Sequence, residues 1–356
     1  MSSYWAWLGR MALFGLIGSV SVGFLLRADL QPKAPQASDP FLSQAQLVPF
    51  DPEYFLPSSY GTGGQYIAAG ERINLPAIPT SRVTPLLTPE ESKVIPDLPL
   101  DRDATPPNLP PASAAPQPPS GSPVVAASTA AVMPPFNLSQ SISRNRRLFD
   151  TPVSLGMLAI GVAEGNYRVF VEGSNLYVEQ TPLYFGHIDP GNLSWGERVT
   201  NYGPCSDQGR SGGNMAVAEE MCLQRSRDRL PTNLQDLHNA GIHPDEDLEA
   251  VINTADLYNQ ASPVHSRVFP QALRMAYRGG LQGVEAMAWA RTASFYLNEN
   301  NALDIERGYN RASGLLGICA REHRPVTEWE CVYGDQLRRS RAIASVLEKY
   351  FQVYVP

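Results

Sequence analysis

The chain has 356 residues, of which 43% are hydrophobic and only 18% are charged, and its formal net charge is −7. An acidic chain lacks the basic surface with which proteins neutralise phosphates, so nucleic acid is excluded as an expected partner. The composition is uneven, because 22 of the 32 prolines lie between residues 31 and 150. This unevenness predicts that a proline-rich segment precedes a folded domain.

An apolar segment of sixteen residues, Met11–Leu26, stands near the N-terminus between Arg10 and Arg27. At about 1.5 Å per residue it spans roughly 24 Å, slightly less than the hydrocarbon core of a bilayer. No small-x-small cleavage site follows it, so a retained signal anchor is favoured over a cleaved signal peptide. We therefore expect residues 1–29 to form a single transmembrane helix in the inner membrane, with the C-terminal domain in the periplasm.

Residues 30–147 are rich in proline, alanine, serine and glutamine, most clearly from Thr105 to Pro119. Such a composition buries too little apolar surface to offset the entropy cost of ordering the chain. The segment is predicted to be a disordered linker that, if extended, holds the domain on the order of 100 Å or more from the membrane. Residues 50–79 contain more aromatic side chains than a spacer needs. An inert spacer is still preferred for them, and docking on a partner or on the folded domain stays open.

Helical periodicity dominates the predicted folded domain, residues 148–356. One hairpin is expected, with Tyr167–Val171 paired to Leu176–Gln180 across a Glu-Gly-Ser-Asn turn. A mostly helical domain with one small hairpin belongs to the α+β class. Helices are expected over residues 152–164, 214–230, 244–260, 269–277, 283–297 and 335–350.

All four cysteines lie in this domain, and an exported compartment favours two disulfides. Three pairings are possible, of which we prefer Cys205–Cys222 with Cys319–Cys331 because they close the shortest loops. A zinc site built from Cys319, His323 and Cys331 is the alternative, but its spacing matches no common zinc motif. We expect no metal ion and no cofactor.

Glu164 is the first charged side chain after the uncharged stretch Thr151–Ala163. It falls on the apolar stripe of the predicted helix and precedes Gly165, which suits a left-handed helix end. Apolar neighbours and the negative end of the helix dipole both disfavour the carboxylate form. General acid catalysis at a glycosidic bond requires such a protonated carboxyl group. The alternative is a structural carboxylate that caps the chain or pairs with Arg168.

Two short motifs extend this pattern, Ala159-Ile-Gly-Val-Ala-Glu-Gly-Asn166 and Thr181-Pro-Leu-Tyr-Phe-Gly-His-Ile-Asp-Pro-Gly-Asn192. The order of a helix ending in Glu-Gly, a hairpin and a Gly-His resembles phage-type lysozymes. The motifs are also similar to a group of uncharacterised, membrane-anchored cyanobacterial proteins with the same pattern. The resemblance implies a lysozyme-like fold over residues 150–350 at most, with Glu164 as the general acid.

The resemblance also implies a second catalytic group, which stays open among Asp189, Glu172 and Thr181. Asp189 is preferred because Pro190 and Gly191 make its loop rigid and sharply turned, as in the acidic loop of related chitosanases. The structural alternative for Asp189 is a simple Asx turn.

Four further residues are expected at or beside the substrate site. Aromatic rings bind sugars by stacking, and each could equally lie in the core. His187 is expected mainly to support the hairpin by hydrogen bonding. The candidates for substrate binding are Tyr167, Tyr184, His187 and Trp195.

The function predicted from these residues is cleavage of a β-1,4-linked amino-sugar polymer of the cell wall, with peptidoglycan as the preferred substrate. Hydrolysis and lytic transglycosylation both remain open. The expected partners are this glycan and the membrane. The alternative from another class is an envelope binding or scaffold protein that keeps the lysozyme-like fold without turnover.

Overall fold

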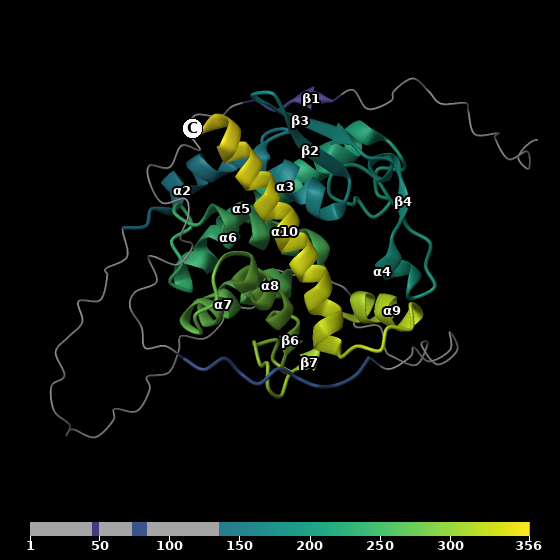
Figure 1. Ribbon diagram of the computed structural model, residues 1–356, viewed down its shortest axis with the longest axis vertical. Coiled ribbons are helices and arrows are strands. Elements are labelled where there is room, and N and C mark those ends of the chain that lie inside the picture. The colour runs from purple at the N-terminus through teal and green to yellow at the C-terminus, as the bar shows by residue number, and fades with distance from the viewer. Residues whose placement is uncertain (1–44, 50–72, 84–134, 356) are drawn as a thin grey trace, which may run out of the picture. The chain divides into compact units, whose positions relative to one another are not determined.

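The computed structural model describes residues 45–49, 73–83 and 135–355 (Figure 1). The domain is rich in helices and has small sheets, which confirms the α+β class. The predicted transmembrane helix of residues 1–29 lies outside the described residues. Within the part of the chain that is described, no helix is long and apolar enough to cross a bilayer.

All six predicted helices are present, with shifted ends, and short ones that were not predicted lie before and between them. The helices are α2 (Leu138–Asn145), α3 (Leu155–Glu164), α4 (Pro190–Leu193), α5 (Met215–Asn239), α6 (Leu248–Gln260), α7 (Pro263–Arg278), α8 (Gly283–Ala293), α9 (Ser313–Arg321) and α10 (Glu328–Tyr354), with 3-10 helices η3 (Arg146–Phe149) and η4 (Pro182–Phe185). The strands are β1 (Gln46–Leu47), β2 (Tyr167–Glu172), β3 (Asn175–Gln180), β4 (His187–Ile188), β5 (Thr200–Asn201), β6 (Tyr296–Leu297) and β7 (Tyr309–Asn310).

Helix α3 is buried along nearly its whole length: eight of its ten residues are inaccessible to solvent. A helix that is apolar on all sides must be covered on all sides, and α6, α10 and β2 pack against it. Gly161 allows β2 to approach, since a Cβ atom there would lie only 2.2 Å from the Tyr167 ring. Helix α10 runs beside α3 and continues across the domain (Figure 1).

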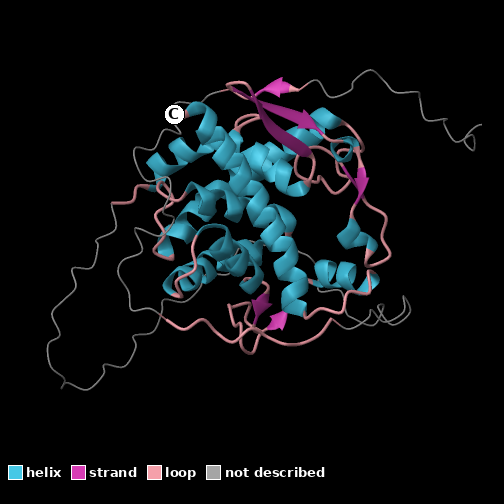
Figure 2. Ribbon diagram, in the orientation of Figure 1, coloured by secondary structure: helices cyan, strands magenta, loops and turns pink. Residues whose placement is uncertain are grey.

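The predicted hairpin is confirmed as β2 and β3, paired from Tyr167 with Gln180 to Glu172 with Asn175. Gly173 turns the chain between them with a φ of 61°, which glycine adopts without steric cost. Strand β1 adds antiparallel to the other edge of β3, so the sheet order is β1-β3-β2. This sheet lies near the end of α10, and the β6–β7 pair lies near its start (Figures 1 and 2).

The predicted linker, residues 30–147, contains structured pieces, which corrects its boundary. Val48 is buried, and its N–H donates to the Leu176 carbonyl at 2.9 Å. The Tyr354 hydroxyl, near the end of α10, donates to the Val48 carbonyl. Helix α2 also precedes the predicted domain start at residue 148. The short apolar stretch around Val48 docks because β3 offers it an unpaired edge.

A second piece of the linker, residues 73–83, lies against α7 and the start of α10. The Ile73 N–H donates to the Arg278 carbonyl, and the Val83 N–H donates to the Val326 carbonyl, both at 3.2 Å. We preferred an inert spacer for residues 50–79 and left docking open, and residues 73–79 lie in the segment that contacts the folded domain. Residues 50–72 are not among those described.

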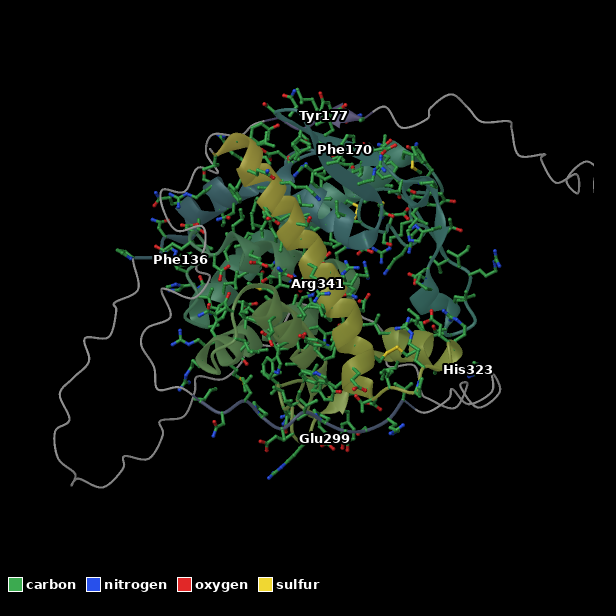
Figure 3. All side chains as sticks on the ribbon, viewed as in Figure 1. Phe136, Phe170, Tyr177, Glu299, His323 and Arg341 are labelled. Carbon is green, nitrogen blue, oxygen red and sulfur yellow. A yellow bond between two sulfur atoms is a disulfide. The ribbon has the colours of Figure 1, made fainter. Side chains whose placement is uncertain are left out.

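Both preferred disulfides, Cys205–Cys222 and Cys319–Cys331, are confirmed (Figure 3). The first ties the loop before α5 to α5, and the second ties α9 to α10. The alternative zinc site would need the thiolates of Cys319 and Cys331, which the second disulfide joins. No group of three His, Cys, Asp or Glu side chains among the described residues has an arrangement that would hold a metal ion.

Candidate active site at Glu164

Glu164 is the last residue of α3, and the chain turns sharply after it. Gly165 has a φ of 85°, so it forms the predicted left-handed helix end. The Thr181 hydroxyl donates to the Gly165 carbonyl at 2.8 Å, and Thr181 in turn begins η4. This bond fixes the chain that follows the hairpin beside the end of α3, so the structure brings Thr181 next to Glu164.

The Glu164 carboxylate is held through one oxygen. Its Oε1 accepts from Arg339 Nη2 at 2.6 Å and from Asn259 Nδ2 at 2.9 Å. The side chain is 12% exposed, and Oε2 has no hydrogen-bond partner among the described residues. Glu164 therefore has charged and polar neighbours where apolar ones were expected.

Arg339 belongs to a buried cluster of ion pairs behind Glu164. Its Nε and Nη2 donate to both oxygens of Asp256, at 2.9 and 2.6 Å, and Arg291 Nη2 donates to Asp256 Oδ2 at 2.7 Å. Burial alone would raise the pKa of Asp256, but the charges of Arg339 and Arg291 outweigh it, and the pKa lies below its usual value. Asp256 is therefore ionised, and the cluster fixes the orientation of the guanidinium that holds Glu164.

Polar side chains of α6 and α10 complete the cluster. Arg291 Nε donates to Gln336 Oε1 at 2.7 Å, and its Nη1 donates to the side-chain oxygen of Asn253 at 3.2 Å. Its Nη2 also donates to Gln260 Oε1 at 3.0 Å. A charged group without solvent needs such partners, since each unpaired buried donor destabilises the fold.

Asp189, the preferred second catalytic group, caps α4. Its Oδ1 accepts from the N–H groups of Gly191 at 2.7 Å and Asn192 at 3.0 Å. This is the Asx arrangement that we named as the structural alternative. Asp189 Oδ2 has no hydrogen-bond partner within the described ranges, and no described contact joins Asp189 to Glu164.

Glu172 lies at the far end of β2, where the strand meets the hairpin turn. Glu172 lies five positions beyond Tyr167, the first residue of the strand, which corresponds to about 17 Å along the strand. Because Tyr167 follows Glu164 closely in the chain, Glu172 is far less well placed than Thr181 to act beside Glu164.

Tyr167 and Tyr184 lie in the core rather than at a sugar-binding surface. They are 4% and 1% exposed, and their rings stack on each other with centroids 5.4 Å apart. The Tyr184 hydroxyl donates to Glu219 Oε1. Our expectation that these two rings stack on sugars is therefore wrong, because protein atoms cover both of them.

The other two candidates, His187 and Trp195, are not buried in the core. His187 Nδ1 lies 2.8 Å from the Leu183 carbonyl, a local bond that matches the expected supporting role. Trp195 is 46% exposed, and Leu183, Phe185 and Leu193 are exposed to a similar degree. A ring in this state is available for stacking on a ligand.

Sequence reasoning missed four of the groups that surround Glu164. Asn259 and Arg339 contact it directly, and Asp256 and Arg291 hold Arg339 in place. One signal existed in α6, where Asn253, Asp256 and Gln260 follow one another at helical spacing among buried apolar residues. Such a stripe of polar side chains on a buried helix indicates an internal polar cluster.

Comparison with known proteins gives no match for this chain among family models, curated proteins or solved structures.

Proposed function

We propose that this chain is a lysozyme-like glycosidase that cleaves a β-1,4-linked amino-sugar polymer, with peptidoglycan as the substrate and Glu164 as the general acid. The observation that carries the proposal is that only one of the two carboxylate oxygens of Glu164 is hydrogen-bonded to the protein. Two donors fix Oε1, whereas Oε2 has no partner and the side chain retains access to solvent. A fixed carboxyl group with one open oxygen is suited to deliver a proton to a defined position.

In the proposed reaction, Oε2 of protonated Glu164 donates its proton to the glycosidic oxygen as the bond to the anomeric carbon breaks. The oxocarbenium-like species is then attacked by water or by the sugar's own C6 hydroxyl. The Glu164 carboxylate takes up the proton that the attacking hydroxyl loses. Arg339 shares its charge with Asp256, so Glu164 is not its only counter-ion and can exchange a proton while Arg339 stays paired.

The second group determines which attack occurs. Asp189 Oδ1 is engaged by α4, and its Oδ2 is the oxygen that would orient water for hydrolysis. If Asp189 does not act, attack by the C6 hydroxyl yields a 1,6-anhydro sugar, the product of a lytic transglycosylase. Trp195, beside α9, supplies the exposed ring for a neighbouring sugar.

The proposed setting is the periplasmic side of the inner membrane, with Met11–Leu26 as the anchor. The two disulfides support an oxidising compartment, because reducing compartments rarely retain structural disulfides. The cell wall is the glycan that a domain in this location meets.

The alternative is an envelope binding protein without turnover. It is favoured by the ion pair between Glu164 and Arg339, which gives Glu164 a structural role. It is also favoured by the use of Asp189 as a helix cap. A binding protein and an enzyme differ only in whether bonds break, so turnover separates them.

The test is the release of soluble fragments from purified peptidoglycan by the wild-type protein and by Glu164→Gln. Glutamine keeps the acceptor for Arg339 and Asn259 but cannot donate the acidic proton, so we expect turnover to fall at least about a hundredfold. The matched control is Glu299→Gln, an exposed glutamate in the loop between β6 and β7 (Figure 3). Equal turnover in wild type and Glu164→Gln would contradict the assignment of Glu164.

A further inference from the structure

Guanidinium groups outnumber carboxylates in the network around Glu164. Asn259, which contacts Glu164, also accepts from Arg225 Nη1 at 2.9 Å. With Arg291, Arg338 and Arg339, four arginines from α5, α8 and α10 join this network. The carboxylates in it are Glu164, Asp256 and Asp335. Glu164 therefore lies beside several guanidinium groups.

Arg338 differs from its neighbours in exposure. The Arg291 and Arg339 side chains are 0% and 4% exposed, whereas that of Arg338 is 54% exposed. Arg338 nevertheless has a defined place beside Glu164, because its Nη1 donates to the carbonyl of Ala163 at 2.9 Å. It is the solvent-facing guanidinium adjacent to the proposed acid.

Two hydrogen bonds hold the Arg338 guanidinium, and they use only some of its N–H donors. Its Nη2 donates to Asp335 Oδ1 at 2.8 Å, and Asp335 Oδ2 is itself fixed by Gln260 Nε2 at 2.7 Å. A guanidinium has five N–H donors, of which two are used in these contacts. The remaining donors, including Nε–H, have no partner in the described part of the chain.

We propose that Arg338 binds a carboxylate of the substrate and thereby selects an acidic amino-sugar polymer over a neutral or cationic one. This inference rests on the proposed function. The planar guanidinium binds carboxylates through paired hydrogen bonds, which an ammonium group cannot reproduce. Muramic acid units of peptidoglycan carry lactyl carboxylates, whereas N-acetylglucosamine polymers are neutral and glucosamine polymers are cationic. The exposed Arg338 guanidinium itself also repels a cationic polymer.

The test compares two tetrasaccharides that differ in the lactyl carboxylate: chitotetraose and the alternating N-acetylglucosamine–N-acetylmuramic acid tetrasaccharide. Full-length protein carrying Glu164→Gln, in detergent, is titrated with each, so that binding is measured without cleavage. We expect at least tenfold tighter binding of the acidic sugar, and loss of most of this preference when Arg338→Gln is added. Raising the salt concentration is expected to weaken only the acidic sugar's binding.

The matched control is Arg341→Gln, which removes an exposed guanidinium from the same helix (Figure 3). No hydrogen bond or ion pair among the described residues joins Arg341 to α3. This variant should retain the preference. Equal binding of the two sugars, no binding of the acidic sugar at millimolar concentration, or the same loss in both arginine variants would overturn the proposal. Turnover of peptidoglycan by the wild type is scored separately. Preferential binding of the acidic sugar without turnover refutes the proposed enzyme and supports the role of Arg338. Turnover without preferential binding supports the enzyme and refutes the role of Arg338.

Discussion

Glu164 depends on residues that are distant in the chain. Its two donors, Asn259 and Arg339, lie 95 and 175 residues further on, in α6 and α10. The position of Glu164 at a helix end was predictable, because the uncharged stretch before it and Gly165 after it are local signals. Its ion pair was not predictable, because nothing in the sequence near Arg339 indicates which of twenty-five arginines reaches α3.

Asp256 is the residue on which the buried cluster depends. Asp256→Asn removes the charge that two buried guanidinium groups share, and it keeps the side-chain volume. We expect the free energy of unfolding to fall by about 3–5 kcal/mol, as when one partner of a buried ion pair is lost. Urea denaturation measures it. The control is Glu322→Gln, which breaks the exposed pair with Arg324 and should cost less than about 1 kcal/mol. Similar losses for the two variants would contradict the role of the cluster.

Glu249, in the first turn of α6, is expected to make the free energy of unfolding depend on pH. Burial, and then the negative charge of Asp247, raise the pKa of Glu249 to about 7. Because the folded state holds this proton more tightly than the unfolded chain, the contribution is complete below about pH 4.3 and is lost as the pH rises through about 7. Glu249→Gln removes this loss, so we expect a gain in the free energy of unfolding at pH 8 of roughly 1–3 kcal/mol.

The measurement is the difference between wild type and Glu249→Gln in thermal or urea unfolding from pH 5 to pH 8. The difference isolates Glu249, because His265, whose pKa burial lowers to about 4, contributes equally to both proteins. A difference that does not change with pH would refute the prediction.

At the scale of elements, long helices and the hairpin were predictable and short elements were not. The hairpin follows from alternating apolar residues and Gly173, and α3 follows from an apolar run with a glycine end. Helix α9 was missed because its nine residues give little periodicity. Helix α4 was missed although Asp189 and Pro190 form an ordinary helix start, since we assigned them to a catalytic loop.

The disulfides fix α9 and the loop before α5, and the effect of removing them is measurable. Each of the paired variants, Cys205→Ser with Cys222→Ser and Cys319→Ser with Cys331→Ser, should lower the free energy of unfolding by about 2–4 kcal/mol. Reductant should lower the Tm of the wild type. It should not change the Tm of the variant in which all four cysteines are replaced by serine. A wild-type Tm that does not respond to reductant would show that the bonds do not constrain the fold.

At the scale of the whole molecule, some pieces of the proline-rich segment belong to the folded domain. Composition predicted a linker over residues 30–147, because pairing with a distant sheet edge leaves no compositional trace. If the proposed anchor ends at Leu26, at most residues 27–45 separate it from β1, which pairs with β3. Nineteen residues span at most about 65 Å, well below the 100 Å expected for the entire segment. The proposed anchor would then let the domain reach only wall layers close to the membrane.

The two segments that contact the domain, β1 with Val48 and residues 73–83, should contribute to the free energy of unfolding. A protein of residues 45–356 keeps β1 and residues 73–83, and one of residues 135–356 lacks them. Without these pieces the site that buries Val48 and the contact of Leu75 with Gly279 are exposed. We expect the shorter protein to lose about 2–4 kcal/mol, the contribution of burying one or two aliphatic side chains. Equal unfolding curves for the two proteins would show that the pieces are only loosely attached.

Mass analysis of peptidoglycan products formed in ¹⁸O-labelled water tests most directly whether Glu164 performs glycosidic chemistry. Wild-type protein should generate new chain ends, either reducing ends that carry the label, from hydrolysis, or unlabelled 1,6-anhydro ends, from transglycosylation. Folded Glu164→Gln should form neither above about 1% of the wild-type rate. An absence of new ends with the wild type, or the same ends at the same rate with Glu164→Gln, would contradict the proposed enzyme.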